Sequence, residues 1–99
     1  DTVRGWWQHA PEWSRDALRR HVHRDVQDGD VAPILLDLAL RSPAELCITP
    51  IQDILGLDGS ARMNLPGTPD GNWRWRLQEG QLSGAAAAQL AALTREADR

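Results

Sequence analysis

The sequence contains no lysine, no tyrosine and no phenylalanine, and it has a single cysteine, Cys47. One cysteine cannot form an internal disulfide and fits a reducing compartment, so we expect a cytoplasmic location. No apolar run approaches the roughly 18 residues that a membrane-spanning helix needs, and we expect no membrane partner. The first residues also lack the charged start and apolar stretch of a signal peptide. All eleven basic side chains are arginines, but the formal net charge is -3, which argues against a nucleic-acid partner.

Common metal and phosphate motifs are missing too. His21 and His23 are two residues apart, so on a helix their side chains diverge and cannot share a metal ion. There is no Gly-rich phosphate loop, no zinc-ligand spacing and no nucleophile elbow. We therefore expect no metal and no cofactor. The arginines near residues 15–24 could contact phosphates, but a solvent-facing helix explains them better.

Apolar residues at helical spacing predict three helices and one helical turn. The helices are expected from about Pro11 or Ser14 to Arg24, from Val31 to Arg41 and from Ser83 to Ala97, and the turn over Ile51–Leu57. Asp30 is the expected N-cap of the second helix, whose two apolar sides indicate that it is largely buried. Residues 1–10 are expected to be an entry segment before the first helix.

One short strand is predicted between the second helix and the helical turn. Glu45 to Pro50 is a nearly continuous apolar run with β-branched members, as expected for a strand covered on both faces. A single strand cannot form a sheet, so Leu46–Thr49 needs neighbours that this chain does not contain. A buried strand with helices before and after it is typical of a parallel α/β fold, here mostly helical as an isolated chain.

The long irregular segment from Asp58 to about Gly80 is the strongest candidate for a functional element. It contains Arg62-Met63-Asn64-Leu65-Pro66-Gly67-Thr68 and then Gly71-Asn72-Trp73-Arg74-Trp75-Arg76. Rigid turn formers, amide and guanidinium donors and two indoles suit the binding of a molecule rich in hydroxyl groups, such as a sugar.

Four residues are candidates for substrate binding, each with a structural alternative. We favour Asn64 as a direct sugar contact because its amide both donates and accepts; the alternative is a turn asparagine bonded to its own backbone. Arg62 bonds a hydroxyl or a carboxylate, or else forms a purely structural ion pair. Gln52 and Asp53 orient neighbours at the rim of a site; the favoured alternative for Asp53 is a carboxylate stabilised by a helix N-terminus.

The tryptophans have two interpretations as well. In an extended segment the Trp73 and Trp75 indoles share one face and could stack on a sugar ring. We favour packing of both indoles against the last helix, because tryptophan is usually largely buried. The same burial is expected for Trp6 and Trp7, with Trp13 on the apolar face of the first helix.

Four motifs, in this order, resemble the C-terminal part of the amylomaltases (4-alpha-glucanotransferases, or disproportionating enzymes). They are Asp1-Thr2-Val3-Arg4-Gly5-Trp6-Trp7, Pro50-Ile51-Gln52-Asp53-Ile54-Leu55-Gly56-Leu57 and the two loop motifs above. The resemblance covers essentially the whole chain; Leu65 stands where threonine is common in the family. It implies that residues 1–99 are an incomplete C-terminal segment of a single (β/α)8 barrel domain: the helices of unit seven, strand eight, its loop and helix eight.

The resemblance also implies a function. Amylomaltases transfer α-1,4-glucan segments to a sugar 4-hydroxyl with retention of configuration, so the implied partners are α-1,4-glucans and maltooligosaccharides. Their carboxylate nucleophile, acid/base and stabilising aspartate would all lie upstream, and Asp1 would be a later aspartate of the same segment. No catalytic residue is therefore expected here, and the chain alone, without the rest of the barrel, should be inactive. The alternative is a small independent helical protein-interaction module without catalysis.

Overall fold

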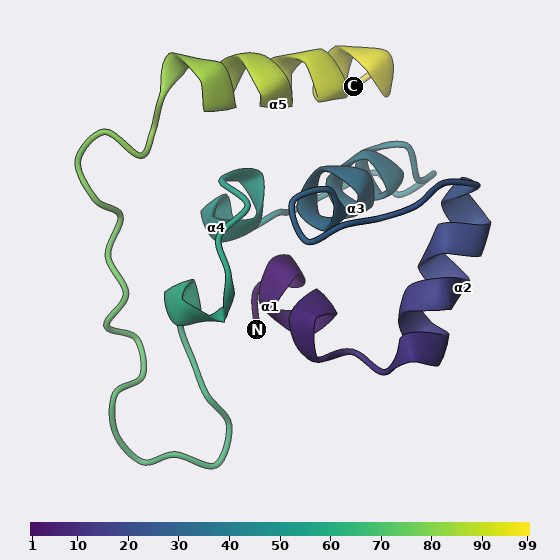
Figure 1. Cartoon of the computed structure of the whole chain (residues 1–99). Coiled ribbons are helices and arrows are strands. Elements are labelled where there is room, and N and C mark those ends of the chain that lie inside the picture. Colours follow the sequence, from purple (N-terminus) through teal and green to yellow (C-terminus); the bar gives the residue numbers. More distant parts are fainter.

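Helices make up nearly all the regular structure of the computed structural model, which describes residues 1–99 (Figure 1). They are α1 (Val3–His9), α2 (Glu12–Val22), α3 (Val31–Leu40), α4 (Ile51–Ile54) and α5 (Gly84–Glu96), with a 3-10 turn, η1 (Gly59–Ala61), before the long loop. Helix α3 lies at the centre and contacts α1, α4 and α5. None of the helices combines the length and apolar character needed to cross a membrane.

Helices α2, α3 and α5 lie where the sequence predicts them, within two residues at each end. The Oγ of Ser83 caps α5 by accepting a hydrogen bond from the Ala86 N–H at 3.1 Å. Asp30 is the N-cap residue of α3, but its carboxylate accepts from the Gln27 N–H at 2.9 Å and not from the first helical turn. The helical spacing of apolar residues and the residues at the helix ends therefore determine these three helices.

Helix α1 was not predicted, and its N-terminus shows why. The Oγ1 of Thr2 accepts from the Gly5 N–H at 3.0 Å, as an N-cap does. The Oδ1 of Asp53, in α4, accepts from the Val3 N–H at 2.8 Å. Two of the four N–H groups that a helix start leaves without partners are thus satisfied. The Thr2 cap is a local signal, whereas the second acceptor, Asp53, lies fifty residues away and no local pattern reveals it.

The core lies where α1, α2 and α3 meet, around the fully buried Trp7, Val26 and Val31. Five partly buried residues pack against it: Val3, Leu18, Val22, Ile34 and Leu35. The guanidinium groups of Arg15 and Arg19 lie 5.9 and 5.3 Å from the centre of the Trp7 ring. Charged side chains of α2 thus cover the indole by cation–π contact while their stems exclude water.

The predicted strand over Leu46–Thr49 is wrong for this chain. The segment is an irregular connection between α3 and α4, and the structure contains no strand. Leu46 and Ile48 are 74% and 81% exposed, so the predicted cover on both faces is absent as well. A strand needs a neighbour for its N–H and C=O groups, and the chain offers none.

The predicted burial of the tryptophans is correct for Trp7 alone. Trp73 and Trp13 are 67% and 73% exposed, and Trp6 is 39% exposed. Trp75 is half-buried. Residues 62–83 run as a wide arc away from the helices, so the indoles of this arc have little surface to pack against (Figure 1).

The arc leaves the chain unusually open. It exposes 6762 Å² of surface, whereas a compact monomer of 11.0 kDa exposes about 5,600 Å². All eleven buried residues lie within residues 1–61. The part of the molecule that positions a site is therefore the cluster of α1, α3, α4 and η1.

Candidate functional site: a polar pocket beside the N-terminus of α1

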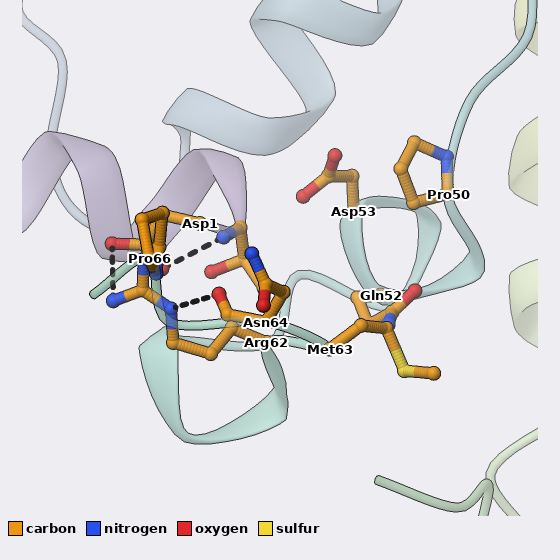
Figure 2. Close-up of a pocket in the computed structure, with 9 residues that line it drawn as sticks. Asp1, Pro50, Gln52, Asp53, Arg62, Met63, Asn64 and Pro66 are labelled. Carbon is orange, nitrogen blue, oxygen red and sulfur yellow. Dashed lines mark hydrogen bonds and ion pairs between the residues drawn. The ribbon is translucent and has the colours of Figure 1, made fainter. Parts of the chain in front are cut away.

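A pocket of about 340 Å³ lies where the start of α1, the start of α4 and the loop after η1 meet (Figure 2). Its volume is at the lower end of the range found for small-molecule sites. The four candidate binding residues all line it: Gln52, Asp53, Arg62 and Asn64. The other lining residues are Asp1, Thr2, Pro50, Met63 and Pro66. The structure thus brings the four predicted residues together, from two segments of the chain.

Asp53 joins α4 to α1. Its Oδ1 accepts the 2.8 Å hydrogen bond from the Val3 N–H, so the carboxylate lies against the N-terminus of α1. The helix dipole favours a negative charge there. The favoured structural interpretation of Asp53 therefore describes the observed contact, although the helix that it stabilises is α1 and not its own.

Gln52 lines the pocket and is only 9% exposed. Its Nε2 donates to the backbone C=O of Ala61 at 3.3 Å. Ala61 is itself buried and is followed directly by Arg62. The Gln52 amide therefore holds the point at which the loop leaves η1.

Arg62 contacts a carboxylate and the backbone of its own loop. Its Nη1 lies 3.7 Å from Oδ2 of Asp1, and its Nε donates to the C=O of Asn64 at 3.1 Å. The two charged side chains are 29% and 24% exposed, and at such exposure an ion pair adds little to stability. The contact matters for geometry, because it places the guanidinium between α1 and the Asn64 peptide.

Asn64 is exposed, and its side-chain amide makes no hydrogen bond within the chain. The alternative of a turn asparagine bonded to its own backbone therefore does not describe it. The adjacent turn forms without its help: the Thr68 N–H donates to the Leu65 C=O at 3.3 Å, across Pro66 and Gly67. With proline second and a glycine at φ 84° third, this is a type II turn.

Asn72 takes the role of the turn asparagine and was not among the predicted site residues. Its Oδ1 accepts from the Leu65 N–H at 2.8 Å, and its Nδ2 donates to the Thr68 C=O at 3.0 Å. Its neighbour Trp73 donates its N–H to the Met63 C=O at 2.6 Å. The Pro69-Asp70-Gly71 turn, which returns the chain toward Leu65, was the signal that could have identified Asn72.

Three carboxylates in or near the pocket have partners within the chain. Asp1 faces Arg62, and Asp53 holds α1. Asp58 does not line the pocket: its Oδ1 accepts from the Ser60 hydroxyl at 2.6 Å and from the Ser60 N–H at 3.0 Å. These two hydrogen bonds, the hydroxyl first, lower the pKa of Asp58 below its ordinary value of 3.8. No group of three or more metal-binding side chains is arranged to hold an ion.

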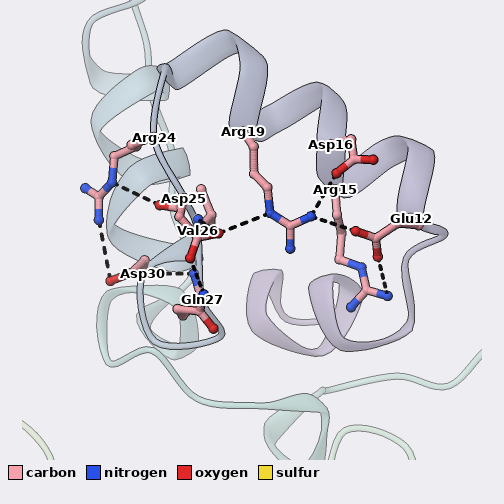
Figure 3. Close-up of polar contacts among 9 residues, drawn as sticks. All are labelled: Glu12, Arg15, Asp16, Arg19, Arg24, Asp25, Val26, Gln27 and Asp30. Carbon is pink, nitrogen blue, oxygen red and sulfur yellow. Dashed lines mark hydrogen bonds and ion pairs between the residues drawn. The ribbon is translucent and has the colours of Figure 1, made fainter.

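Two of the three arginines of α2, Arg15 and Arg19, form ion pairs with carboxylates (Figure 3). Nη1 of Arg19 lies 2.7 Å from Glu12 and 2.9 Å from Asp16. The hydrogen bond that Arg19 donates to Glu12, and then the one that it donates to Asp16, raises the pKa of Arg19 above its ordinary value. Arg15 lies 3.3 Å from Glu12. The paired charges and the contact with Trp7 fit a structural surface better than a phosphate-binding one.

Comparison with known proteins identifies the family. A family model described as 4-alpha-glucanotransferase matches residues 1–83. The chain belongs to the 4-alpha-glucanotransferase family. The matched span contains every residue that lines the pocket and ends just before α5. The resemblance drawn from the four motifs is thereby confirmed.

Individual relatives carry the same name. The chain is 43% identical over 77 residues to the 4-alpha-glucanotransferase of Aquifex aeolicus, covering 78% of this chain and 16% of the relative. It is 36% identical over 103 residues to the enzyme of Thermus thermophilus, covering all of this chain and 21% of the relative. It is 44% identical over 77 residues to the chloroplastic/amyloplastic enzyme of Oryza sativa, covering 78% of this chain and 13% of the relative. The chain thus spans about a fifth or less of the length of these relatives.

Proposed function

We propose that the complete polypeptide transfers α-1,4-glucan segments to the 4-hydroxyl of an acceptor sugar, and that this chain supplies part of the glucan-binding cleft. The observation that carries the proposal is the pocket beside α1. It gathers Gln52, Asp53, Arg62 and Asn64 within the span that the 4-alpha-glucanotransferase family model matches. The substrates are α-1,4-glucans and maltooligosaccharides.

The pocket offers the groups that a sugar needs. Asn64 presents an amide with both a donor and an acceptor, and neither is used inside the chain. Asp53 keeps one carboxylate oxygen on α1 and has a second for a hydroxyl. Pro50 and Pro66 add apolar lining suited to the C–H face of a sugar ring. In this arrangement Asn64 contacts the sugar and Asp53, Gln52 and Arg62 form the rim.

Catalysis comes from outside these residues. Retaining transfer needs two carboxyl groups about 5 Å apart on either side of the reacting carbon. The two carboxylates that line the pocket, Asp1 and Asp53, are held by Arg62 and by the α1 backbone. We propose that the nucleophile, the acid/base and the stabilising aspartate belong to the rest of the domain, as the resemblance implies, and that the 99-residue chain alone is inactive.

The exposed segment Leu46–Thr49 indicates where the chain belongs in the complete domain. We propose that residues 1–99 form the C-terminal part of a (β/α)8 barrel and that Leu46–Thr49 becomes strand eight when its neighbours are present. Leu46 and Ile48 are exposed here, and the chain spans a small share of its relatives. Pairing with neighbouring strands would bury both side chains and satisfy their backbone groups.

A cytoplasmic location is proposed from the single cysteine alone. The name of the relative from Oryza sativa assigns that protein to plastids. Fractionation of the source cells with an antibody against the chain, followed by immunoblotting, tests the location.

Disproportionation of maltotriose tests the function. The complete polypeptide should convert maltotriose into glucose and longer maltooligosaccharides, detected by chromatography. Asn64→Ala should lower kcat/KM about threefold to tenfold, as expected for the loss of one or two hydrogen bonds to a sugar. The melting temperature should hardly change, because the Asn64 side chain has no partner in the chain.

Gln89→Ala is the matched control, since Gln89 is an exposed amide on α5 outside the pocket. It should leave the transfer rate unchanged. If the complete polypeptide transfers no glucan, the proposed function is wrong. If Asn64→Ala lowers the melting temperature sharply while the folded fraction keeps its rate, the assignment of Asn64 to the sugar is wrong.

A further inference from the structure

The loop that carries Asn64 has no regular structure, yet the peptide group that follows Asn64 is held at both of its polar atoms. Its oxygen, the C=O of Asn64, accepts the hydrogen bond from Nε of Arg62 at 3.1 Å. Its nitrogen, the N–H of Leu65, donates to Oδ1 of Asn72 at 2.8 Å. Two side chains on opposite sides of the loop thus fix the orientation of one peptide plane. Together with the anchored position of Arg62, that plane restricts the backbone angle ψ of Asn64 and therefore the direction of its Cα–Cβ bond.

Asn72 is suited to this role because its amide is used at both ends. While Oδ1 holds the Leu65 N–H, Nδ2 donates to the C=O of Thr68 at 3.0 Å. The hydroxyl of Thr68 in turn donates to the Leu65 C=O at 2.6 Å. Asn72 therefore bonds to both ends of the turn over residues 65–68, and the turn is closed by its own bond between Thr68 and Leu65. A carboxylate could not donate to the Thr68 C=O, and an apolar group could make neither bond.

The other end of the loop is anchored to the helical cluster. Arg62 follows the buried Ala61, whose C=O accepts from Gln52. Its guanidinium lies against Asp1 at the start of α1. Residue 62 therefore has a fixed position relative to the pocket, and Asn72 is the remaining restraint on the Asn64–Leu65 peptide.

We propose that Asn72 is a positioning residue for glucan binding: it touches no sugar itself and directs the Asn64 amide into the pocket by holding the Leu65 N–H. This inference rests on the proposed function and deepens it by separating the residue that binds from the residue that orients. Preorganisation of this kind lowers the entropy lost when a ligand immobilises a side chain. Its loss weakens substrate binding more than it slows the chemical step.

Three variants of the complete polypeptide test the proposal with maltotriose as substrate. Asn72→Ala should raise KM about threefold to tenfold and change kcat less than twofold, as expected for one lost preorganising contact. Asn72→Asp keeps the oxygen that holds Leu65 and should have a KM closer to that of the unaltered protein. Gln81→Ala is the control, because Oε1 of Gln81 accepts from the Gln78 N–H in the same arc but away from the pocket. Its KM should not change.

A double variant shows whether Asn72 acts through Asn64. In an Asn64→Ala background, Asn72→Ala should have no further effect on KM. If the two effects multiply, Asn72 contributes independently of Asn64 and the proposal is overturned. An unchanged KM in Asn72→Ala alone overturns it as well.

Hydrogen exchange separates failure of this inference from failure of the proposed function. Exchange at Leu65, followed by mass spectrometry of peptides spanning residues 62–68, should accelerate in Asn72→Ala and stay slower in Asn72→Asp. This readout needs no activity. Unaltered exchange at Leu65 in Asn72→Ala overturns the inference even if maltotriose is converted. Accelerated exchange in a protein that does not convert maltotriose refutes the function, and with it the binding role assigned to Asn72.

Discussion

Residues 1–61 contain all eleven buried residues of the chain, whereas residues 62–99 contain none. In the first region, helices pack on one another around Trp7 and Val31, and α4 caps α1 through Asp53. In the second region, the loop is held mainly by hydrogen bonds between nearby residues, such as those of Asn72. Packing thus gives the first region its shape, and local polar contacts give the second region its own.

Helix α5 belongs to the second region and is also attached to the first by polar contacts. It is joined to the α3 region by polar contacts near its end: Nε of Arg99 donates to the Leu40 C=O at 2.6 Å, and Arg41 lies 3.5 Å from Glu96. None of its residues is buried. The pocket lies at the border between the two regions, with Asp53 on the packed side and Asn64 on the open side.

The largest expected effect compares two tryptophans, one from each region. Trp7→Ala should lower the free energy of unfolding of the chain by about 3–5 kcal/mol, because it empties the most buried aromatic site. Trp73→Ala should change it by less than about 0.5 kcal/mol, because that indole is 67% exposed. Urea unfolding followed by far-UV circular dichroism measures both. Equal losses would show that the two regions do not differ as described.

Gly5 in the first region and Gly84 in the second differ in the space around their backbones. A Cβ on Gly5 would lie 2.4 Å from Oδ1 of Asp1 and 2.9 Å from the Gly59 Cα, so Gly5→Ala must separate α1 from η1. We expect a loss of about 1–3 kcal/mol in the free energy of unfolding. At Gly84, the first residue of α5, a Cβ would meet nothing within 4 Å.

Gly84→Ala is therefore the matched control. It should stabilise the chain by about 0.4–1 kcal/mol, since alanine restricts the unfolded chain and favours the helix. Urea midpoints of the two variants give the comparison. A Gly5→Ala protein as stable as the unaltered chain would mean that α1 and η1 are not in close contact.

The smallest expected effect concerns Asp58, which lies on the surface at the border of the two regions. The Ser60 hydroxyl and N–H lower the pKa of Asp58 below 3.8. A lowered folded-state pKa contributes stability that is complete above the unfolded value and is lost as the pH falls through the folded value. Carboxyl chemical shifts should show a titration midpoint below 3.8 in the unaltered chain.

Ser60→Ala should move that midpoint back toward 3.8, because the hydroxyl that donates to Asp58 is removed. A midpoint at or above 3.8 in the unaltered chain would contradict the hydrogen bonds seen at η1.

The sequence allowed α2, α3 and α5 to be predicted because their signals are local. Asp30 and Ser83 stand at helix starts, and apolar residues recur at helical spacing. Helix α1 has a local signal in its N-cap residue Thr2, but the other acceptor at its start, Asp53, lies fifty residues away. The strand at Leu46–Thr49 was wrong for the opposite reason: its pattern is local, but a strand exists only with a partner.

Some residues of the candidate site could also be predicted from local sequence, and others only from the folded structure. Asn64, Arg62, Gln52 and Asp53 could be selected by residue type and by their motifs, and they share one pocket. Asp1 and Thr2 were not selected as lining residues, because they reach the pocket only when α1 packs against α4 and η1. Asn72 was missed because its function in the loop depends on which N–H and C=O groups the turn brings to it.

The central claim is that the Asn64 amide contacts a sugar in a glucan cleft to which this chain contributes. A crystal structure of the complete polypeptide with a bound maltooligosaccharide tests it most directly. The account predicts a sugar hydroxyl within about 2.7–3.2 Å of the Asn64 amide, with Leu46–Thr49 paired to a neighbouring strand. A maltooligosaccharide bound elsewhere, with no contact to Asn64 or to the pocket beside α1, would contradict the account.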